Sequence, residues 1–270
     1  MRRPEDIKDM HIRGDWIKNS EFFSESGREV LSLVIERAGK TLAEGKLPVV
    51  VFDLDSTLFD VSSRSYQILK DWAEHPETIR FVETREKLSD LDPSEMRYSL
   101  EDVWEIKKIP TDVGPFDHHF KHAKQFWRKR FFNHDYLVHD TPTPGAIEFV
   151  NRLFEMGVYI VYLTGRDIPL MAFGTFDQLK SHGLPIERER TRLILKPKRH
   201  MDDLEFKCGA AETIKTLGKV VASFENEPKN LVAMARVFDS DTMNVFIETV
   251  SSDHPAPAGK SIYRIAEFHF

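Results

Sequence analysis

The stretch that decides the fold is PVVVFDLDSTLFD, residues 48–60. Residues 49–52 are apolar and mostly β-branched, which is typical of a strand buried on both faces in a parallel sheet. Asp53 and Asp55 follow at once, and residues two apart on a strand point to the same side. In doubly wound sheets, ligands bind outside the carboxyl ends of the strands. The two aspartates therefore indicate a functional site at this strand end.

Two carboxylates on one side of a strand end repel each other. At ~4 Å the repulsion is about 4 kcal/mol for an effective dielectric of about 20, so one carboxylate is protonated or a cation lies between them. Mg²⁺ prefers oxygen ligands of this kind. The pattern therefore predicts a Mg²⁺ site. The alternative is a purely polar turn, since Asp and Ser are common turn residues.

The rest of the chain alternates apolar runs with helical patterns. Further short runs at 158–163, 193–195, 220–224 and 245–247 predict strands. Helical spacing is present at 28–42, 145–157 and 204–217, and Pro228 suits the first turn of another helix. The alternation predicts an α/β fold with a doubly wound, Rossmann-like parallel sheet.

The spacing of the strands breaks once. About 105 residues separate the strand at 49 from the strand at 158, whereas a strand–helix–strand unit needs about 30. We expect a mostly helical cap at 61–140, inserted into a core formed by 46–60 and 141–270. Residues 1–45 are expected to form an N-terminal helical extension.

Composition limits the class of protein. The 270 residues carry a formal net charge of −6, from 38 Lys and Arg and 44 Asp and Glu, so no chain-wide field attracts nucleic acid. The single cysteine, Cys208, cannot form an internal disulfide, which fits a reducing compartment. No run approaches the ~20 apolar residues of a membrane span. These observations predict a cytoplasmic protein with no membrane contact.

The segment VVVFDLDSTLFD resembles the first motif of the haloacid dehalogenase superfamily, with an aspartate nucleophile and a second aspartate two residues on. The resemblance implies three further motifs, which occur in the expected order. YIVYLTGR supplies Thr164, Gly165 and Arg166 as a phosphoryl-binding segment. The inserted region 61–140 matches the position of the family's cap, between the first and second motifs.

The third motif is a lysine, for which the sequence offers Lys207 in FKCGAAETIK and Lys196 in LILKPKR. The fourth is an acidic group after a strand, and VVASFENEPKN offers Glu225, Asn226 and Glu227. The family more often has Asp there. Glu225 is therefore the first choice for the metal ligand and Asn226 the second.

The resemblance implies a Mg²⁺-dependent phosphatase of the capped type that acts on small phosphorylated substrates through an aspartyl-phosphate. Asp53 would be the nucleophile and a metal ligand. Asp55 would be the general acid and base, with its backbone carbonyl on the metal. Thr164 would bind a phosphoryl oxygen, and Lys207 would offset negative charge. Lys196 is the other lysine candidate, placed here with the substrate-binding group.

Several alternatives stay open from the sequence. Arg166 either contacts substrate or pairs with a structural carboxylate. The Thr-Gly-Arg segment also occurs in polynucleotide phosphatases, which makes a nucleic-acid end a second substrate class, although the net negative charge disfavours it. A catalytically weak binding or scaffold module is a third interpretation. His118 and His122, one turn apart, either belong to a plain amphipathic helix or bind zinc. The sequence leaves the oligomeric state open.

Overall fold

The computed structural model describes residues 10–111 and 118–270, and these divide into two compact units. The core unit contains the described residues through Phe59, Pro142–Pro169 and Leu179–Phe270. The inserted unit contains Asp60–Thr141 and Leu170–Gln178. Within the described ranges, no helix is both long and apolar enough to span a lipid bilayer.

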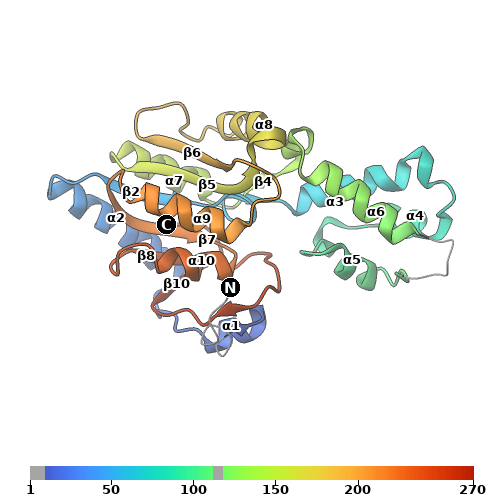
Figure 1. The fold of residues 1–270 in the computed structure, drawn as a ribbon, viewed down its shortest axis with the longest axis horizontal. Helices are drawn as coiled ribbons and strands as arrows, with labels where there is room; N and C mark the ends of the chain where they lie inside the picture. Colours follow the sequence, from blue (N-terminus) through green and yellow to red (C-terminus); the bar gives the residue numbers. More distant parts are fainter. Residues whose placement is uncertain (1–9, 112–117) are drawn as a thin grey trace. The chain divides into compact units, whose positions relative to one another are not determined.

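The core unit is built on a parallel six-stranded sheet with the order β10-β8-β7-β2-β5-β6 (Figure 1). Its strands are β2 (Pro48–Phe52), β5 (Tyr159–Asp167), β6 (Thr191–Lys196), β7 (Lys219–Glu225), β8 (Met243–Ile247) and β10 (Ile262–Ile265). Every residue of β2 is buried, as expected for the middle of a parallel sheet. The predicted doubly wound, Rossmann-like sheet is confirmed. The edge strand β10 was not predicted, because Arg264 interrupts its apolar run.

Helices cover both faces of this sheet (Figure 1). α2 (Gly27–Ala43) and α7 (Ala146–Glu155) pack against Val50 and Phe52 on one face. α9 (Asp203–Ile214) and α10 (Pro228–Ala235) pack against Val49 and Val51 on the other. The alternation of side chains along a strand sends neighbouring residues of β2 into two separate hydrophobic clusters.

The direction of the crossovers reverses next to β2. From β2 the chain adds β5 and β6 on one side, then returns to pair β7 with the other side of β2 and continues outward to β8 and β10. Asp53 follows β2, and Glu225 ends β7. The two carboxylates therefore lie at the topological switch point, where open α/β sheets bind their ligands.

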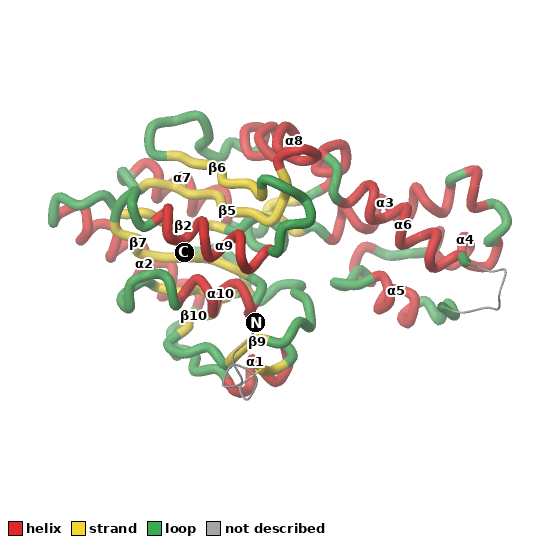
Figure 2. The backbone as a smooth tube through the Cα atoms, viewed as in Figure 1, coloured by secondary structure: helices red, strands yellow, loops and turns green. Residues whose placement is uncertain are grey.

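Short elements complete the core unit and the links to the inserted unit, and Figure 2 shows how loops join them. β1 (Met10–His11) pairs with β9 (Ala256–Pro257), and α1 (Arg13–Asn19) lies between β1 and α2 in the chain. β3 (Phe59–Asp60) and β4 (Thr141–Pro142) form a two-stranded sheet where the chain passes between the units. Helix α8 (Ile168–Ser181) contributes Leu170–Gln178 to the inserted unit.

The inserted unit is helical and has its own hydrophobic cluster, which includes Trp72 and Trp104. Its α-helices are α3 (Ser62–Glu74), α4 (Val82–Ser89), α5 (Leu100–Ile106) and α6 (His119–Phe131), and its 3₁₀ helices are η2 (Pro76–Thr78), η3 (Pro93–Glu95) and η4 (His134–His139). α3 packs on both α4 and α6. A unit with its own apolar core does not depend on the sheet for burial of its helices.

A buried ion pair ties this unit together. Arg64 in α3 donates from Nε and Nη2 to the two carboxylate oxygens of Asp140, at 2.7 and 2.5 Å, and both side chains are fully buried. Gln178 adds a bond of 2.9 Å to the same carboxylate. The geometry is bidentate, which is the strongest arrangement for such a pair.

We predict that Asp140→Ala lowers the free energy of unfolding by about 3–5 kcal/mol, because it removes the carboxylate that binds the buried Arg64 guanidinium through two nitrogens. Urea unfolding followed by tryptophan fluorescence measures this, since Trp72, Trp104 and Trp127 all lie in the inserted unit. Glu101→Ala is the control. It breaks a pair with Lys124 whose side chains are about half exposed, so it should cost less than about 1 kcal/mol. Equal losses in the two variants would contradict the assignment.

Candidate active site

Asp53 leaves β2 through a tight turn that brings Thr57 back beside it. The Asp53 N–H donates to the Phe224 carbonyl at 3.0 Å, which extends the pairing of β2 with β7. Ser56 has φ of 60°, in the left-handed region, and its N–H donates to the Phe59 carbonyl at 2.7 Å. Thr57 then donates its hydroxyl to Asp53 Oδ2 at 3.2 Å. One oxygen of this buried carboxylate is therefore bound by its own turn.

Lys207 holds the other oxygen of Asp53. Its Nζ lies 2.6 Å from Asp53 Oδ1 and 2.6 Å from Glu225 Oε2. Lys207 stands one turn into α9, with 3% of its surface exposed, and Glu225 is fully buried. Of the two candidate lysines, Lys207 contacts Asp53, whereas Lys196 contacts Asp203.

This cluster contains two carboxylates and one ammonium group. Burial, followed by the charge of Glu225, raises the pKa of Asp53 to about 7 against the opposing effect of Lys207. Burial likewise raises the pKa of Glu225. For Lys207, burial favours the neutral form, but Asp53 and Glu225 together raise its pKa. When both carboxyl groups are ionised and Lys207 is protonated, the three buried groups carry a net charge of −1.

A β-bulge in β5 shapes the segment Thr164–Gly165–Arg166. The register with β6 shifts between Thr164 and Asp167, and bulges next to active sites re-aim side chains. Arg166 is buried, and it reaches Asp55 Oδ1 with Nε at 3.0 Å and Nη2 at 2.6 Å. The Thr164 hydroxyl accepts the Arg166 N–H at 3.3 Å. Of the two partners considered for Arg166, the structure shows a carboxylate, that of Asp55.

Asn226 faces the same hydroxyl as Asp53. Its Oδ1 lies 3.4 Å from Thr57 Oγ1, while its Nδ2 donates to the Val250 carbonyl at 2.7 Å. That second bond turns the amide oxygen toward Thr57. By contrast, both oxygens of Glu225 accept hydrogen bonds. Oε2 accepts from Lys207, and Oε1 accepts from the Glu227 N–H at 3.0 Å.

The donor set fits Mg²⁺. The Asp53 carboxylate and the Asn226 amide oxygen converge on one hydroxyl, and both are hard oxygen donors. The excess negative charge of the Asp53–Glu225–Lys207 cluster also favours a cation. Among the residues described, however, no three His, Cys, Asp or Glu side chains gather as a ready metal cluster. A metal here would therefore depend on an amide and a backbone carbonyl besides Asp53.

The remaining predicted residues support the strand-end loops. The Glu227 carboxylate accepts bonds from Ser252 through its N–H at 2.8 Å and its hydroxyl at 2.6 Å. Lys196 Nζ lies 2.5 Å from Asp203 Oδ1. Thr57 and Ser252 are two further residues at these strand ends whose roles were not predicted. Thr57 carried a signal as part of the first motif, but Ser252 carried none, because it follows a different strand.

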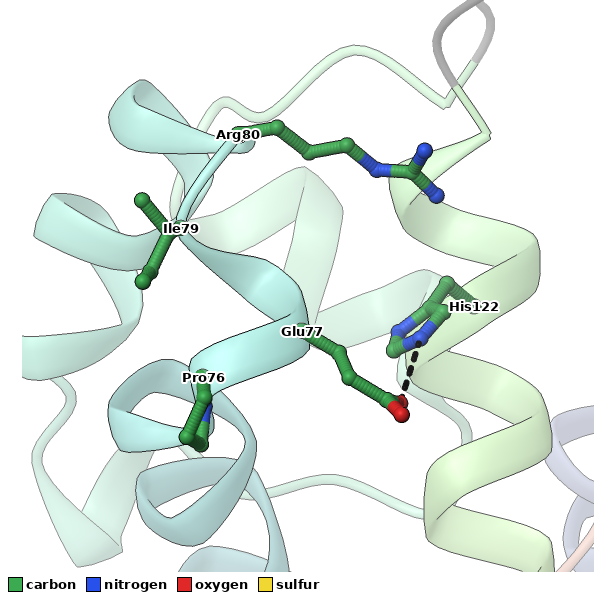
Figure 3. A pocket seen from close by; sticks show the side chains of 5 residues that line it. All are labelled: Pro76, Glu77, Ile79, Arg80 and His122. Carbon is green, nitrogen blue, oxygen red and sulfur yellow. Dashed lines mark ion pairs between the residues drawn. The ribbon is translucent and has the colours of Figure 1, made fainter.

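Helix α6, which contains His122, belongs to the inserted unit and packs against aromatic side chains. His122 Nδ1 accepts the indole N–H of Trp72 at 2.9 Å, and burial lowers the pKa of His122. A pocket of about 530 Å³ opens beside it, lined by Pro76, Glu77, Ile79, Arg80 and His122. In Figure 3 the Glu77 carboxylate points toward His122, at 3.9 Å. Its lining offers no nucleophile beside a base, so the pocket is not the candidate active site.

Comparisons with known proteins bear on the family and the fold of the chain. The family model of the haloacid dehalogenase-like hydrolases matches residues 47–201. A candidate phosphatase from Clostridium difficile shares the fold, with a TM-score of 0.53 and 12% identity over 82% of this chain and 94% of that one. No curated protein matches the chain in sequence.

Two further solved structures cover 82% of this chain. One is a haloacid dehalogenase-like hydrolase from Streptococcus pneumoniae, with 13% identity, 93% of that chain and a TM-score of 0.45. The other is a predicted phosphoglycolate phosphatase from Haemophilus somnus, with 10% identity, 95% of that chain and a TM-score of 0.47. At such identities, no substrate transfers from these proteins to this one.

We predict that Asp53→Asn stabilises the metal-free protein and that the gain grows as the pH rises. Since the pKa of Asp53 is about 7 in the folded state and about 3.9 when unfolded, the folded state alone keeps the proton between these values. The stability of the unmodified protein therefore falls over this range and levels off above pH 7. Each pKa unit corresponds to about 1.4 kcal/mol, so we expect a Tm higher by ~3 °C or more at pH 8.

Thermal unfolding in EDTA from pH 5.5 to 8.5 measures this difference. Asp253→Asn, at an exposed carboxylate, is the control and should leave Tm unchanged throughout. A difference between Asp53→Asn and the unmodified protein that shrinks with rising pH would mean that Asp53 is not held in a destabilised ionised form.

Proposed function

The chain belongs to the haloacid dehalogenase-like hydrolase family, and we propose that it hydrolyses small phosphomonoesters through an aspartyl-phosphate on Asp53, with Mg²⁺. The observation that carries this proposal is the contrast between two carboxylates two residues apart. Asp53 is buried against Lys207, whereas the side chain of Asp55 is 30% exposed and held by Arg166. Two carboxylates in such different environments suit two different roles.

Asp53 is the proposed nucleophile. Thr57 and Lys207 each bind one of its carboxylate oxygens, which limits rotation of the group and fixes its direction of attack. Attack on phosphorus forms the aspartyl-phosphate bond and releases the leaving oxygen. Phosphoryl transfer requires little beyond such positioning and neutralisation of charge, and Lys207 provides one positive charge beside the nucleophile.

Asp55 is the proposed proton carrier. It would give a proton to the leaving oxygen and later take one from the water that hydrolyses the aspartyl-phosphate, so that the same group serves both half-reactions. Arg166 binds Asp55 Oδ1 through two nitrogens and fixes the orientation of the carboxylate. Arg166 is thus proposed as a positioning residue, while Thr164 and Gly165 are proposed to line the phosphoryl site.

Three groups are proposed to hold the metal: the Asp53 carboxylate, the Asp55 backbone carbonyl and Asn226 Oδ1. Bound there, Mg²⁺ would neutralise charge on the phosphoryl oxygens. Glu225 was the first choice from the sequence, but its Oε2 lies against Lys207 and its Oε1 accepts the Glu227 N–H. Asn226 Oδ1 instead faces the Thr57 hydroxyl that also binds Asp53. We therefore propose that Glu225 keeps Lys207 charged and in place, and that Asn226 is the ligand.

The inserted unit is proposed to act as the cap that determines substrate choice. Its larger part, Asp60–Thr141, lies in the chain between the Asp53 motif and the Thr164 motif, and the unit has an apolar core of its own. Its sequence and its pocket carry no arrangement that identifies one substrate.

We expect the purified protein to hydrolyse p-nitrophenyl phosphate only when Mg²⁺ is present, and Asp53→Asn to reduce kcat to background. The amide is too weak a nucleophile to form the covalent intermediate. Release of nitrophenol and of phosphate, measured with Mg²⁺ and with EDTA, provides the test. Magnesium-independent turnover, or wild-type rates in Asp53→Asn, would contradict the proposal.

We also expect Asn226→Ala to raise the Mg²⁺ concentration for half-maximal activity by ~10-fold or more, since loss of even an indirect partner of a metal ligand costs about 10- to 100-fold in affinity. Glu225→Gln keeps the shape and should mainly lower kcat, through its effect on Lys207. Magnesium titrations at saturating substrate separate the two. A larger shift for Glu225→Gln would return the ligand role to Glu225.

A further inference from the structure

We propose that Asp203 and Lys196 form a positioning pair that holds the start of helix α9 against the Thr164–Gly165–Arg166 segment, and so sets where Lys207 and Arg166 stand in the site. This inference rests on the proposed function for its kinetic consequence, but its geometric content is independent of it. It gives Lys196 a role other than contact with substrate.

One face of α9 reaches the site at two points. Asp203 is the first residue of α9, and Lys207 follows four residues later, so both project from the same face of the helix. Lys207 contacts Asp53. The Asp203 carboxylate lies beside Gly165, where a Cβ added to the glycine would lie 3.3 Å from Asp203 Oδ1 and 3.4 Å from its Cγ. Any shift of the first turn of α9 would therefore move both contacts together.

The space beside Gly165 is narrow, because a Cβ there would require the Asp203 carboxylate to move by a few tenths of an ångström. Gly165 has no left-handed backbone angle, so turn geometry does not require a glycine here. The Asp203 carboxylate supplies the reason instead, because it occupies the space next to the Gly165 backbone. Arg166, the next residue, binds Asp55 from a segment that has the Asp203 carboxylate beside it.

Lys196 fixes the carboxylate that makes this contact. Its Nζ lies 2.5 Å from Asp203 Oδ1, and only 10% of the lysine side chain is exposed, against 54% for Asp203. The Lys196 backbone pairs with Asp167, just past the bulge in β5. The pair thus links β6, the bulged part of β5 and α9. The Asp203 carboxylate offsets the charge of Lys196.

A double-mutant cycle distinguishes positioning from substrate binding. If the pair positions the site, Lys196→Met, Asp203→Ala and the double variant should each lower kcat about three- to tenfold, with KM changed less than twofold, because residues that act as one unit give non-additive losses. If Lys196 bound substrate, Lys196→Met would raise KM and Asp203→Ala would not. Lys198→Met and Glu205→Ala, which remove exposed charges from the same loop and helix turn, are the matched controls.

Gly165→Ala provides a compensation test. The new methyl group should lower kcat in the wild-type background, where it meets the Asp203 carboxylate. It should cause less than a twofold further loss in Asp203→Ala, where that carboxylate is gone. Equal losses in the two backgrounds would overturn the proposed contact.

Hydrogen–deuterium exchange of the full chain tests the geometry without relying on turnover. In Asp203→Ala and Lys196→Met, amides at 163–168 and 203–208 should exchange at least about threefold faster, while those of β8 and β10 should not change. Wild-type exchange in both segments would overturn the inference. If the wild-type protein fails to hydrolyse any phosphomonoester while exchange rises as expected, the proposed function fails and the positioning pair stands.

Discussion

The buried contact of Lys207 with Asp53 and Glu225 is the interaction on which the rest of the site depends. The two carboxylates end or follow neighbouring strands, β2 and β7, so the sheet itself forces them together. A single ammonium group at 2.6 Å from each makes their burial tolerable, since removal of such a partner leaves uncompensated charge in a low dielectric. The remaining negative charge gives the cluster its attraction for a cation.

This constraint explains why α9 must begin where it does. The helix has to deliver Lys207 to the switch point between β2 and β7, so its first turn must meet the carboxyl ends of the strands. The N-cap, Asp202, accepts the Glu205 N–H at 3.0 Å and sets that starting position. The Asp203 carboxylate lies beside Gly165, so the helix start stands next to the bulge in β5.

Two departures from regular strand geometry serve the same edge of the sheet. Ser56 adopts a left-handed conformation that returns Thr57 to Asp53, and the bulge in β5 directs Arg166 to Asp55. Ser56 directly follows Asp55 in the chain, and the bulge carries Arg166, whose guanidinium binds Asp55. Local strain of this kind persists only where surrounding packing holds it. β2, which is buried throughout, and β7, which is buried from Val220 to Glu225, provide that packing.

The sequence by itself determined the fold class, because continuous apolar runs and helical spacing report directly on which faces are buried. It also named Asp53, Lys207, Arg166 and Asn226, since each follows a strand or opens a helix. What it left open were partners: Lys207 or Lys196, Glu225 or Asn226, substrate or carboxylate for Arg166. Those choices depend on distances between segments that lie far apart in the chain. Only the tertiary structure shows that Lys207 lies against Asp53 and Glu225. It likewise shows that Asn226 Oδ1 faces Thr57 and that Arg166 binds Asp55. Side-chain bonds such as those between Ser252 and Glu227 or Asp203 and Lys196 leave no periodic trace in a sequence, because they arise when separate strand ends meet.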